Sequence, residues 1–289
     1  MKKINYLNNK DILKEIHKSK LTYCSFTEPA VTSYDAIVTG IKAITKSVIL
    51  DAREARGERI AKEAQEADAL LGKKRKLDEF LLPTEDIPAT DVVFRVMTWE
   101  HIPIDDIKQK KADAKAQEEY NKDLFETEYD EPEVVVKGAT KYVKVNFPPF
   151  KHYKVTEEAS PYTVGISHQK GGIDSGFFSK DHGQMTPKLA HMFVKLCERY
   201  ATRSNWRGYT YNDEMRSQAL LQLSQIGLQF DESKSQNPFA YYTAAITNSF
   251  TRVLNIEKRN QNIRDDILEM NAYNPSYTRQ NQRGGGSEE

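Results

Sequence analysis

Apolar residues recur every three or four positions through the last third of the chain, which predicts helices. Each periodic stretch begins at a capping residue or at a proline suited to a first helical turn, such as Asn237 followed by Pro238. We expect three helices, at residues 188–202, 212–229 and 238–259. Together they would form one helical domain.

The third predicted helix has two different faces. Its apolar positions predict a buried stripe of Phe239, Tyr242, Ile246, Phe250 and Val253. A second row at the same spacing consists of Tyr241, Ala245, Asn248, Arg252, Asn255 and Arg259. Exposed aromatic rings stack on bases and arginines contact phosphates, so this row is suited to unpaired or distorted nucleic acid. The alternative is a solvated surface with an incidental tyrosine.

The earlier part of the chain shows mixed patterns. Residues 10–20 predict a short amphipathic helix, and residues 34–82 predict a solvated helix or a helical hairpin. Strands are expected at residues 90–99 and, as a pair joined by a turn, at residues 133–147. Residues 156–184 are rich in Gly, Ser and His without periodicity, which predicts a long loop.

Charge is segregated along the chain, although the formal net charge is zero. Of the 289 residues, 38% are hydrophobic and 29% charged, so we expect part of the length in exposed helices or mobile segments. Residues 187–264 contain 11 Lys and Arg against 6 Asp and Glu, a net charge of +5. Residues 113–133 contain 2 against 9, a net charge of −7. The basic stretch coincides with the predicted helical domain, and the acidic run is predicted to be an exposed linker.

Residue types used in catalysis or metal binding show no convergent pattern. The six histidines have no metal-ligand spacing, and Cys24 and Cys197 are too few for a zinc site. We therefore expect no enzyme, no metal and no cofactor. An enzyme that uses His168, Asp174 and His182 of the Gly-rich loop is a weaker alternative. The cysteine usage and the lack of a secretion signal or membrane span predict a cytoplasmic protein with no membrane partner.

The segment that begins at Asp213, DEMRSQALLQLSQIGLQFDESKSQNPFAYYTAAITNSFTRVL, resembles region 2 of the sigma-factor family. In that family an acidic residue opens a helix, a Phe followed by an acidic residue closes it, and a turn leads to an aromatic helix. Aligned without gaps, Phe230 falls on the closing Phe. Tyr241 falls on the tyrosine that stacks the flipped adenine of the minus-ten promoter element. Asn248 corresponds to a glutamine at the upstream edge of that element, and Arg252 corresponds to an arginine.

The similarity is closer still to the late-transcription sigma factors of T-even bacteriophages. It includes GYT at Gly208, FDESKSQNPFAYYT from Phe230 and NYLNNKDIL from Asn5. The region 2 resemblance covers about a third of the chain. It implies that the partners are the host RNA polymerase core and promoter DNA, together with the phage sliding clamp and a late co-activator.

The resemblance and the polar row of the third helix together predict two sets of site residues. Those expected to dock on the clamp helices of the largest polymerase subunit are Glu214, Ser217, Gln218 and Leu221. Those expected at the minus-ten element are Tyr241, Thr243, Asn248, Arg252, Asn255 and Arg259.

The chain also departs from the family. The tryptophan pair that follows the stacking tyrosine is replaced by Ala244 and Ala245, no helix-turn-helix follows Arg264, and the ending YTRQNQRGGGSEE lacks the family's clamp-binding motif. Promoter choice would therefore rest on an A/T-rich minus-ten element, which unstacks easily, and on accessory factors.

These observations predict a mainly α fold with a three-helix region 2 core, an N-terminal helix and a long α+β insertion. We expect an N-terminal helix at residues 1–22, the insertion at 23–186, the region 2 domain at 187–271 and a flexible tail at 272–289. The expected function is that of a phage sigma factor, which binds the host core polymerase and recognises and melts a short minus-ten late promoter element. The alternative is a non-catalytic adaptor that binds polymerase and does not read DNA.

Overall fold

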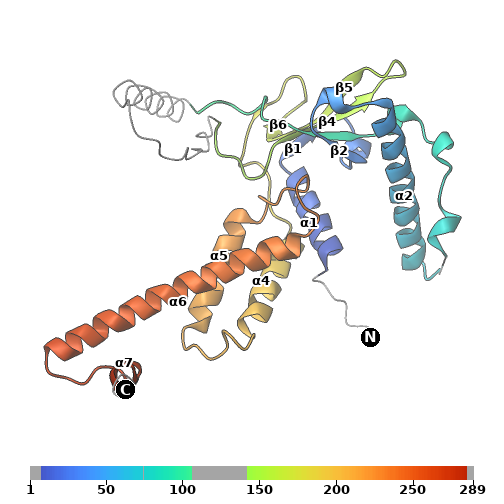
Figure 1. Cartoon of the computed structure of the whole chain (residues 1–289). Helices are drawn as coiled ribbons and strands as arrows, with labels where there is room; N and C mark the ends of the chain where they lie inside the picture. The colour runs from blue at the N-terminus through green and yellow to red at the C-terminus, as the bar shows by residue number, and fades with distance from the viewer. Residues whose placement is uncertain (1–7, 74, 106–141, 285–289) are drawn as a thin grey trace, which may run out of the picture. The chain divides into compact units, whose positions relative to one another are not determined.

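The computed structural model describes residues 8–73, 75–105 and 142–284, which divide into two compact units (Figure 1). One unit combines residues 1–16 with residues 185–289, and the other comprises residues 17–184. Helices account for about half of the structure, and a small mixed sheet lies in the second unit. The expected mainly α fold is therefore met only loosely. None of the described helices is both long and apolar enough to cross a membrane.

Two long helices of the first unit, the helical unit, begin at a side-chain cap. Thr186 Oγ1 accepts a hydrogen bond from Leu189 N at 3.3 Å, and Asn237 Oδ1 accepts one from Ala240 N at 3.0 Å. A proline follows each cap, and its missing N–H needs no partner in the first turn. The helices of this unit are α1 Asn9–Leu21, of which residues 9–16 belong here, α4 Pro187–Ala201, α5 Asn212–Ile226, α6 Pro238–Met270 and α7 Tyr277–Gly284.

The predicted helices of this unit are confirmed, with changes at their ends. The helices expected at residues 10–20 and 188–202 differ from α1 and α4 by one residue at each end. α5 ends at Ile226 rather than at residue 229, and α6 continues 11 residues past the predicted end at residue 259. Asp265 is the one buried residue in that continuation, so hydrophobic periodicity could not signal it.

The segment 272–289, expected to be a flexible tail, contains helix α7. Ser276 precedes α7 and donates from its backbone N and its Oγ to the two carboxylate oxygens of Asp265, at 2.8 and 2.7 Å. Arg279 Nη2 lies 2.6 Å from Asp266 Oδ1. These contacts join α7 to the last turns of α6.

The core of the helical unit lies between α4, α5 and α6. The predicted apolar stripe of α6 is confirmed, with Tyr242, Ile246, Phe250 and Val253 buried and Phe239 half-buried. The ring of Tyr242 meets Phe193 of α4 edge-on at 4.8 Å, and its hydroxyl donates to Gly227 O at 2.5 Å. Gly227 therefore sits where three helices converge.

We expect Gly227→Ala to destabilise the helical unit by about 2 kcal/mol, because overpacking a close contact costs roughly that much. A Cβ at this position would lie 2.6 Å from the ring of Phe193 and 2.7 Å from the backbone oxygen of Leu223. Urea unfolding followed by circular dichroism measures the change. The matched control is Gly208→Ala, whose Cβ would meet no atom within 4 Å. Equal stability of the two variants would contradict the close packing at Gly227.

The second unit, the sheet unit, is built on a five-stranded sheet in the order β1-β5-β4-β3-β2. β2 and β3 are parallel, and the other neighbours are antiparallel. The strands are β1 Cys24–Phe26, β2 Ala36–Val38, β3 Phe94–Met97, β4 Phe150–Val155 and β5 Pro161–Ser167, with a separate pair, β6 Gln169–Lys170 and β7 Phe177–Phe178. Helix α2 spans Lys46–Leu70, and short 3-10 helices lie at Pro29–Val31, Ile41–Ala43, Leu77–Glu79, Thr84–Asp86 and Ala89–Asp91.

Several expectations for the sheet unit are wrong. The helix predicted at residues 34–82 is interrupted, because β2 pairs with β3 and only α2 is α-helical. The strand predicted at residues 90–99 shortens to β3, since a 3-10 helix occupies its start. The loop predicted at residues 156–184 contains β5, β6 and β7. β2 and β3 are distant in sequence, and local patterns do not reveal their pairing, whereas β5 pairs with nearby β4 as well as with distant β1, and β7 pairs with nearby β6.

Two other expectations concern residues that the structure does not describe. The acidic run at residues 113–133 lies wholly outside the described residues, as does most of the strand pair expected at residues 133–147. Of that pair, residues 142–147 are described, and the strand expected there is wrong, because they contain only an isolated antiparallel bridge between Tyr142 and Ile104.

A buried carboxylate ties α2 to the sheet. Asp35 Oδ1 accepts hydrogen bonds from Arg59 Nε at 3.0 Å and from Arg59 Nη2 at 2.6 Å. Asp35 Oδ2 accepts one from Val93 N at 2.9 Å, and Arg56 Nη1 lies 3.5 Å from the same oxygen.

We expect Asp35→Asn to destabilise the sheet unit by about 3 kcal/mol, because it leaves two guanidinium groups without their buried partner. Urea unfolding measures the loss. The control Asp91→Asn, whose half-exposed carboxylate lies 4.0 Å from Arg56, should cost under about 1 kcal/mol, and an equal cost would contradict this role.

A second buried polar cluster surrounds Arg95 of β3. Its guanidinium carbon lies 3.9 Å from the ring centroid of Tyr34 and 3.8 Å from that of Phe150. Arg95 Nε donates to His152 Nε2 at 3.0 Å, and Nη2 lies 3.3 Å from His17 Nδ1. Both imidazoles must stay neutral to accept from this arginine.

Candidate nucleic-acid interface

The polar row of α6 lies on the side of the helix away from its buried stripe. Asn248, Arg252, Asn255 and Arg259 are all exposed. Neither arginine forms an ion pair with another described residue. Ala245, which sequence spacing assigns to the same row, is 8% exposed and so does not belong to the surface. The row can offer two amides and two guanidinium groups to a ligand.

Tyr241 heads this row but is half-buried. Its ring meets Phe230 edge-on at 5.6 Å and Tyr242 edge-on at 5.3 Å. Burial raises the pKa of the Tyr241 hydroxyl above its ordinary value. The two neighbouring rings hold Tyr241 in one orientation, so a base could stack on it without first ordering the side chain.

Thr243 lies outside the row. Residues two apart on a helix point to opposite sides, so Thr243 faces away from Tyr241. Its hydroxyl donates to Phe239 O at 2.8 Å and lies 3.1 Å from Ala240 O, within its own helix. The structure does not bring Thr243 to the side chains with which it was grouped.

The residues expected to contact polymerase lie on α5, and Glu214, Ser217, Gln218 and Leu221 are all exposed. Gln218 Nε2 donates to Glu214 Oε1 at 3.0 Å, one turn apart on the helix. Leu221 keeps 54% of its surface exposed. This face of α5 combines an acidic side chain, an amide and an exposed apolar residue.

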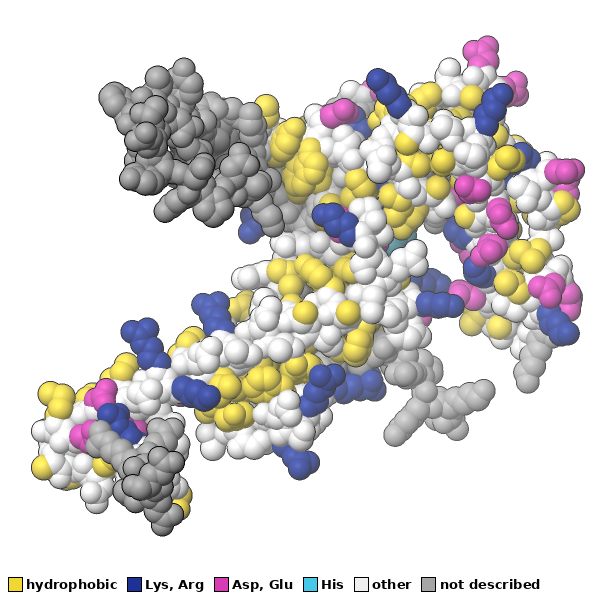
Figure 2. All heavy atoms as spheres, viewed as in Figure 1, with side chains coloured by type: hydrophobic (Ala, Val, Ile, Leu, Met, Phe, Trp, Pro, Cys, Tyr) yellow, Lys and Arg dark blue, Asp and Glu magenta, His cyan; other side chains and the backbone are white. Residues whose placement is uncertain are grey.

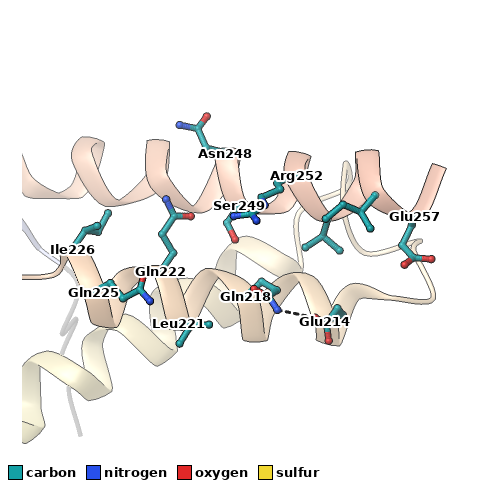
Figure 3. A pocket seen from close by; sticks show the side chains of 12 residues that line it. Glu214, Gln218, Leu221, Gln222, Gln225, Ile226, Asn248, Ser249, Arg252 and Glu257 are labelled. Atoms are coloured by element: carbon teal, nitrogen blue, oxygen red, sulfur yellow. Dashed lines mark hydrogen bonds between the residues drawn. The ribbon is translucent and has the colours of Figure 1, made fainter. Parts of the chain in front are cut away.

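A groove of about 730 Å³ runs between α5 and α6. Figure 3 shows Gln222 and Ser249 reaching into the space between the helices, whereas Asn248 points away from α5. Glu214, Gln218 and Leu221 line the groove from α5, and Arg252 lines it from α6. The structure therefore brings half of the predicted site residues to one groove: Glu214, Gln218, Leu221, Asn248 and Arg252. The other five do not line it: Ser217, Tyr241, Thr243, Asn255 and Arg259.

The groove includes residues that sequence reasoning missed. A second hollow of about 480 Å³ adjoins it at Asn248 and Arg252. Further lining residues of the two are Gln222, Gln225, Ile226, Ser249, Thr251, Val253, Ile256 and Glu257. Gln222 and Gln225 follow Gln218 and Leu221 by four residues, so helical spacing could have identified them.

The Gly-rich segment does not form a convergent site. His168 is buried, and burial lowers its pKa from 6.5 to about 3. Asp174 is exposed, and His182 Nδ1 bonds to Ser179 O at 2.9 Å. Among the described residues, no hydrogen bond joins His168, Asp174 and His182 to one another.

Comparisons with protein-family models, with curated proteins and with solved structures give no match. What the chain does must therefore be argued from its own residues.

Proposed function

We propose that this chain is a phage late sigma factor that binds the core RNA polymerase of its host and opens a short A/T-rich minus-ten promoter element. Helices α4, α5 and α6 would form its region 2 core. The observation that supports this most strongly is the groove between α5 and α6, where Glu214, Gln218 and Leu221 lie across from Arg252. A polymerase-binding face and a DNA-binding face on adjacent helices would let one domain hold both partners.

In this proposal α6 would capture the unpaired strand. Extruding a base costs a few kcal/mol, and stacking on an aromatic ring recovers roughly 1–3 kcal/mol. Tyr241 would provide the ring, Asn248 would contact a base edge, and Arg252 and Arg259 would contact phosphates. Thr243 stays an expected contact that the structure does not support, because its hydroxyl bonds within its own helix.

The two residues that replace the family's tryptophan pair differ in solvent exposure. Ala244 is exposed, whereas Ala245 is buried and could not be part of an outer wedge. A weaker wedge fits a promoter that unstacks easily, since A/T-rich steps are the most readily opened. The phage sliding clamp and a late co-activator would supply the remaining promoter selectivity.

An adaptor that binds polymerase without reading DNA is the second candidate. The packing of Tyr241 on Phe230 and Tyr242 favours it, because such a tyrosine could be purely structural. Specific initiation by purified host core polymerase, with the clamp and co-activator supplied, separates the two. The sigma-factor proposal expects initiation at an A/T-rich late promoter that core alone does not use. No gain over core alone would leave the adaptor as the better proposal.

A further inference from the structure

The connection between α4 and α5 carries basic and aromatic side chains and no acidic one. The stretch RYATRSNWRGYTY at residues 199–211 contains neither Asp nor Glu. Its basic residues are Arg199, Arg203 and Arg207, and its aromatic residues are Tyr200, Trp206, Tyr209 and Tyr211.

The three arginines bring positive charge to this surface, and the guanidinium of Arg203 lies over the ring of Tyr200, with its carbon 4.3 Å from the ring centroid. Arg199, Arg203 and Arg207 are exposed, and none forms an ion pair with another described residue. The nearby carboxylate of Asp213 is taken by Arg216, at 3.0 Å. Guanidinium groups without a carboxylate partner are well suited to phosphate oxygens. In the face seen in Figure 2, basic side chains are spread over the helical unit.

The aromatic rings beside these arginines are partly accessible. Trp206, Tyr209 and Tyr211 are each half-buried. Trp206 meets Phe250 edge-on at 5.3 Å, which anchors the connection to the core, and Tyr209 lies 5.2 Å from Tyr211 with their planes 35° apart. Rings anchored on one side leave the other side available for stacking.

Hydrogen bonds hold the connection in one shape. Asn212 Nδ2 donates to Ala201 O at 3.1 Å and to Trp206 O at 2.9 Å, which joins its two ends. The backbone N of Trp206 and that of Arg207 both donate to Arg203 O, at 2.9 and 3.0 Å. A ligand would therefore find the arginines and rings already placed, with little loop ordering to oppose binding.

This surface is separate from the polar row of α6. Trp206 packs on Phe250, which is two residues from both Asn248 and Arg252 and so points to the other side of the helix. One bound ligand need not touch both surfaces.

We propose that the α4–α5 connection is a second nucleic-acid-binding surface, which takes a single strand. Arg203 and Arg207 contact its phosphates, and an unpaired base stacks at Tyr209 and Tyr211. A single strand fits better than a duplex because rings can stack only on bases that are free of a partner strand. A single strand also fits better than an acidic protein surface, because carboxylates would pair with the arginines but would not stack on the rings.

Fluorescence anisotropy of the full-length chain with a labelled single-stranded DNA of mixed sequence, without polymerase, tests the proposal. The double variant Arg203→Ala, Arg207→Ala is expected to lower the affinity about tenfold or more. It should also reduce the slope of log affinity against log salt by about 1.4, because each phosphate contact on a single strand contributes about 0.7. The matched control is Arg264→Ala, an exposed arginine of α6, which should change the affinity less than twofold.

A third variant, Arg252→Ala with Arg259→Ala, measures the contribution of the α6 row to the affinity for the single strand. Failure of the second surface can therefore be distinguished from failure of the sigma-factor proposal. The inference is overturned if the wild-type chain does not bind at low salt, or if the Arg203 and Arg207 variant keeps the wild-type affinity and salt slope. A labelled poly-glutamate peptide provides the last test. The inference is also overturned if this peptide binds the wild-type chain but not the Arg203 and Arg207 variant, and yet does not displace the DNA. That result would assign the surface to an acidic protein partner.

Discussion

Replacing Tyr241 by alanine is expected to lower promoter opening about 10- to 100-fold while leaving binding to the core polymerase unchanged. The expected loss corresponds to one base–aromatic stack of roughly 1–3 kcal/mol. Permanganate reactivity of unpaired thymines at the promoter measures opening, and comigration with core polymerase measures binding. An adaptor that does not read DNA would show no change in either measurement.

Packing and stacking can be separated at this position, because Tyr241 also contacts Phe230 and Tyr242. Tyr241→Leu keeps an apolar side chain against those rings but cannot stack on a base, so it should open the promoter as poorly as the alanine variant. Tyr241→Phe keeps the ring and should open it almost normally. The control Tyr277→Ala removes a tyrosine that is 77% exposed, outside the proposed site. Normal opening by the leucine variant would refute a stacking role.

The sheet unit is expected to lose several kcal/mol of stability between pH 6.5 and pH 4. Burial, followed by the charge of Arg95, lowers the pKa of His152 from 6.5 to about 3, and burial lowers that of His168 to about 3. Because these folded-state pKa values lie below the unfolded value, the unfolded chain takes up protons first as the pH falls. The stability is fully present above about pH 6.5 and decreases towards pH 3, by about 3 kcal/mol for each histidine at pH 4.

Two other histidines act in the same direction. Burial lowers the pKa of His101 to about 4 and that of His17 well below its ordinary value. Protonation of His17 or His152 would also place a second positive charge against Arg95. Acid should therefore unfold the sheet unit through its buried histidines, two of which, His17 and His152, contact Arg95.

The two tryptophans of the chain make this measurable. Trp99 lies in the sheet unit and Trp206 in the helical unit, so a Trp206→Phe variant reports only on the sheet unit. Its urea midpoint, read by fluorescence, should be much lower at pH 4.5 than at pH 7. Adding His191→Ala, which removes an exposed histidine of the helical unit, should leave that difference unchanged. Equal midpoints at the two pH values would contradict the burial of neutral histidines.

The sequence predicts the helical unit better than the sheet unit for a physical reason. The stripe of α6 from Tyr242 to Val253 repeats at helical spacing, and Asn237 with Pro238 marks its start, so local signals suffice. β2 has only three residues, and its partner β3 lies more than 50 positions away. Nothing local in Ala36–Val38 distinguishes that strand from the start of a helix, because the pairing alone decides it.

The candidate site was predictable in part. Helical spacing placed Asn248, Arg252, Asn255 and Arg259 on one exposed row, which the structure confirms. Spacing could not tell that Ala245 is buried, because that depends on how closely α5 approaches. The arginines of the α4–α5 connection carry no periodic signal, since their arrangement depends on the hydrogen bonds of Asn212.

The length of α6 limits how many nucleotides its polar row could contact. The row extends from Tyr241 to Arg259, which at the rise of an α-helix is about 27 Å. Stacked bases advance 3.4 Å each along a strand, so the row can accompany about eight of them. Under the proposed function, α6 would therefore contact at most about eight stacked nucleotides along this row. A footprint on α6 that is longer than this would require the strand to bend away and meet another part of the protein.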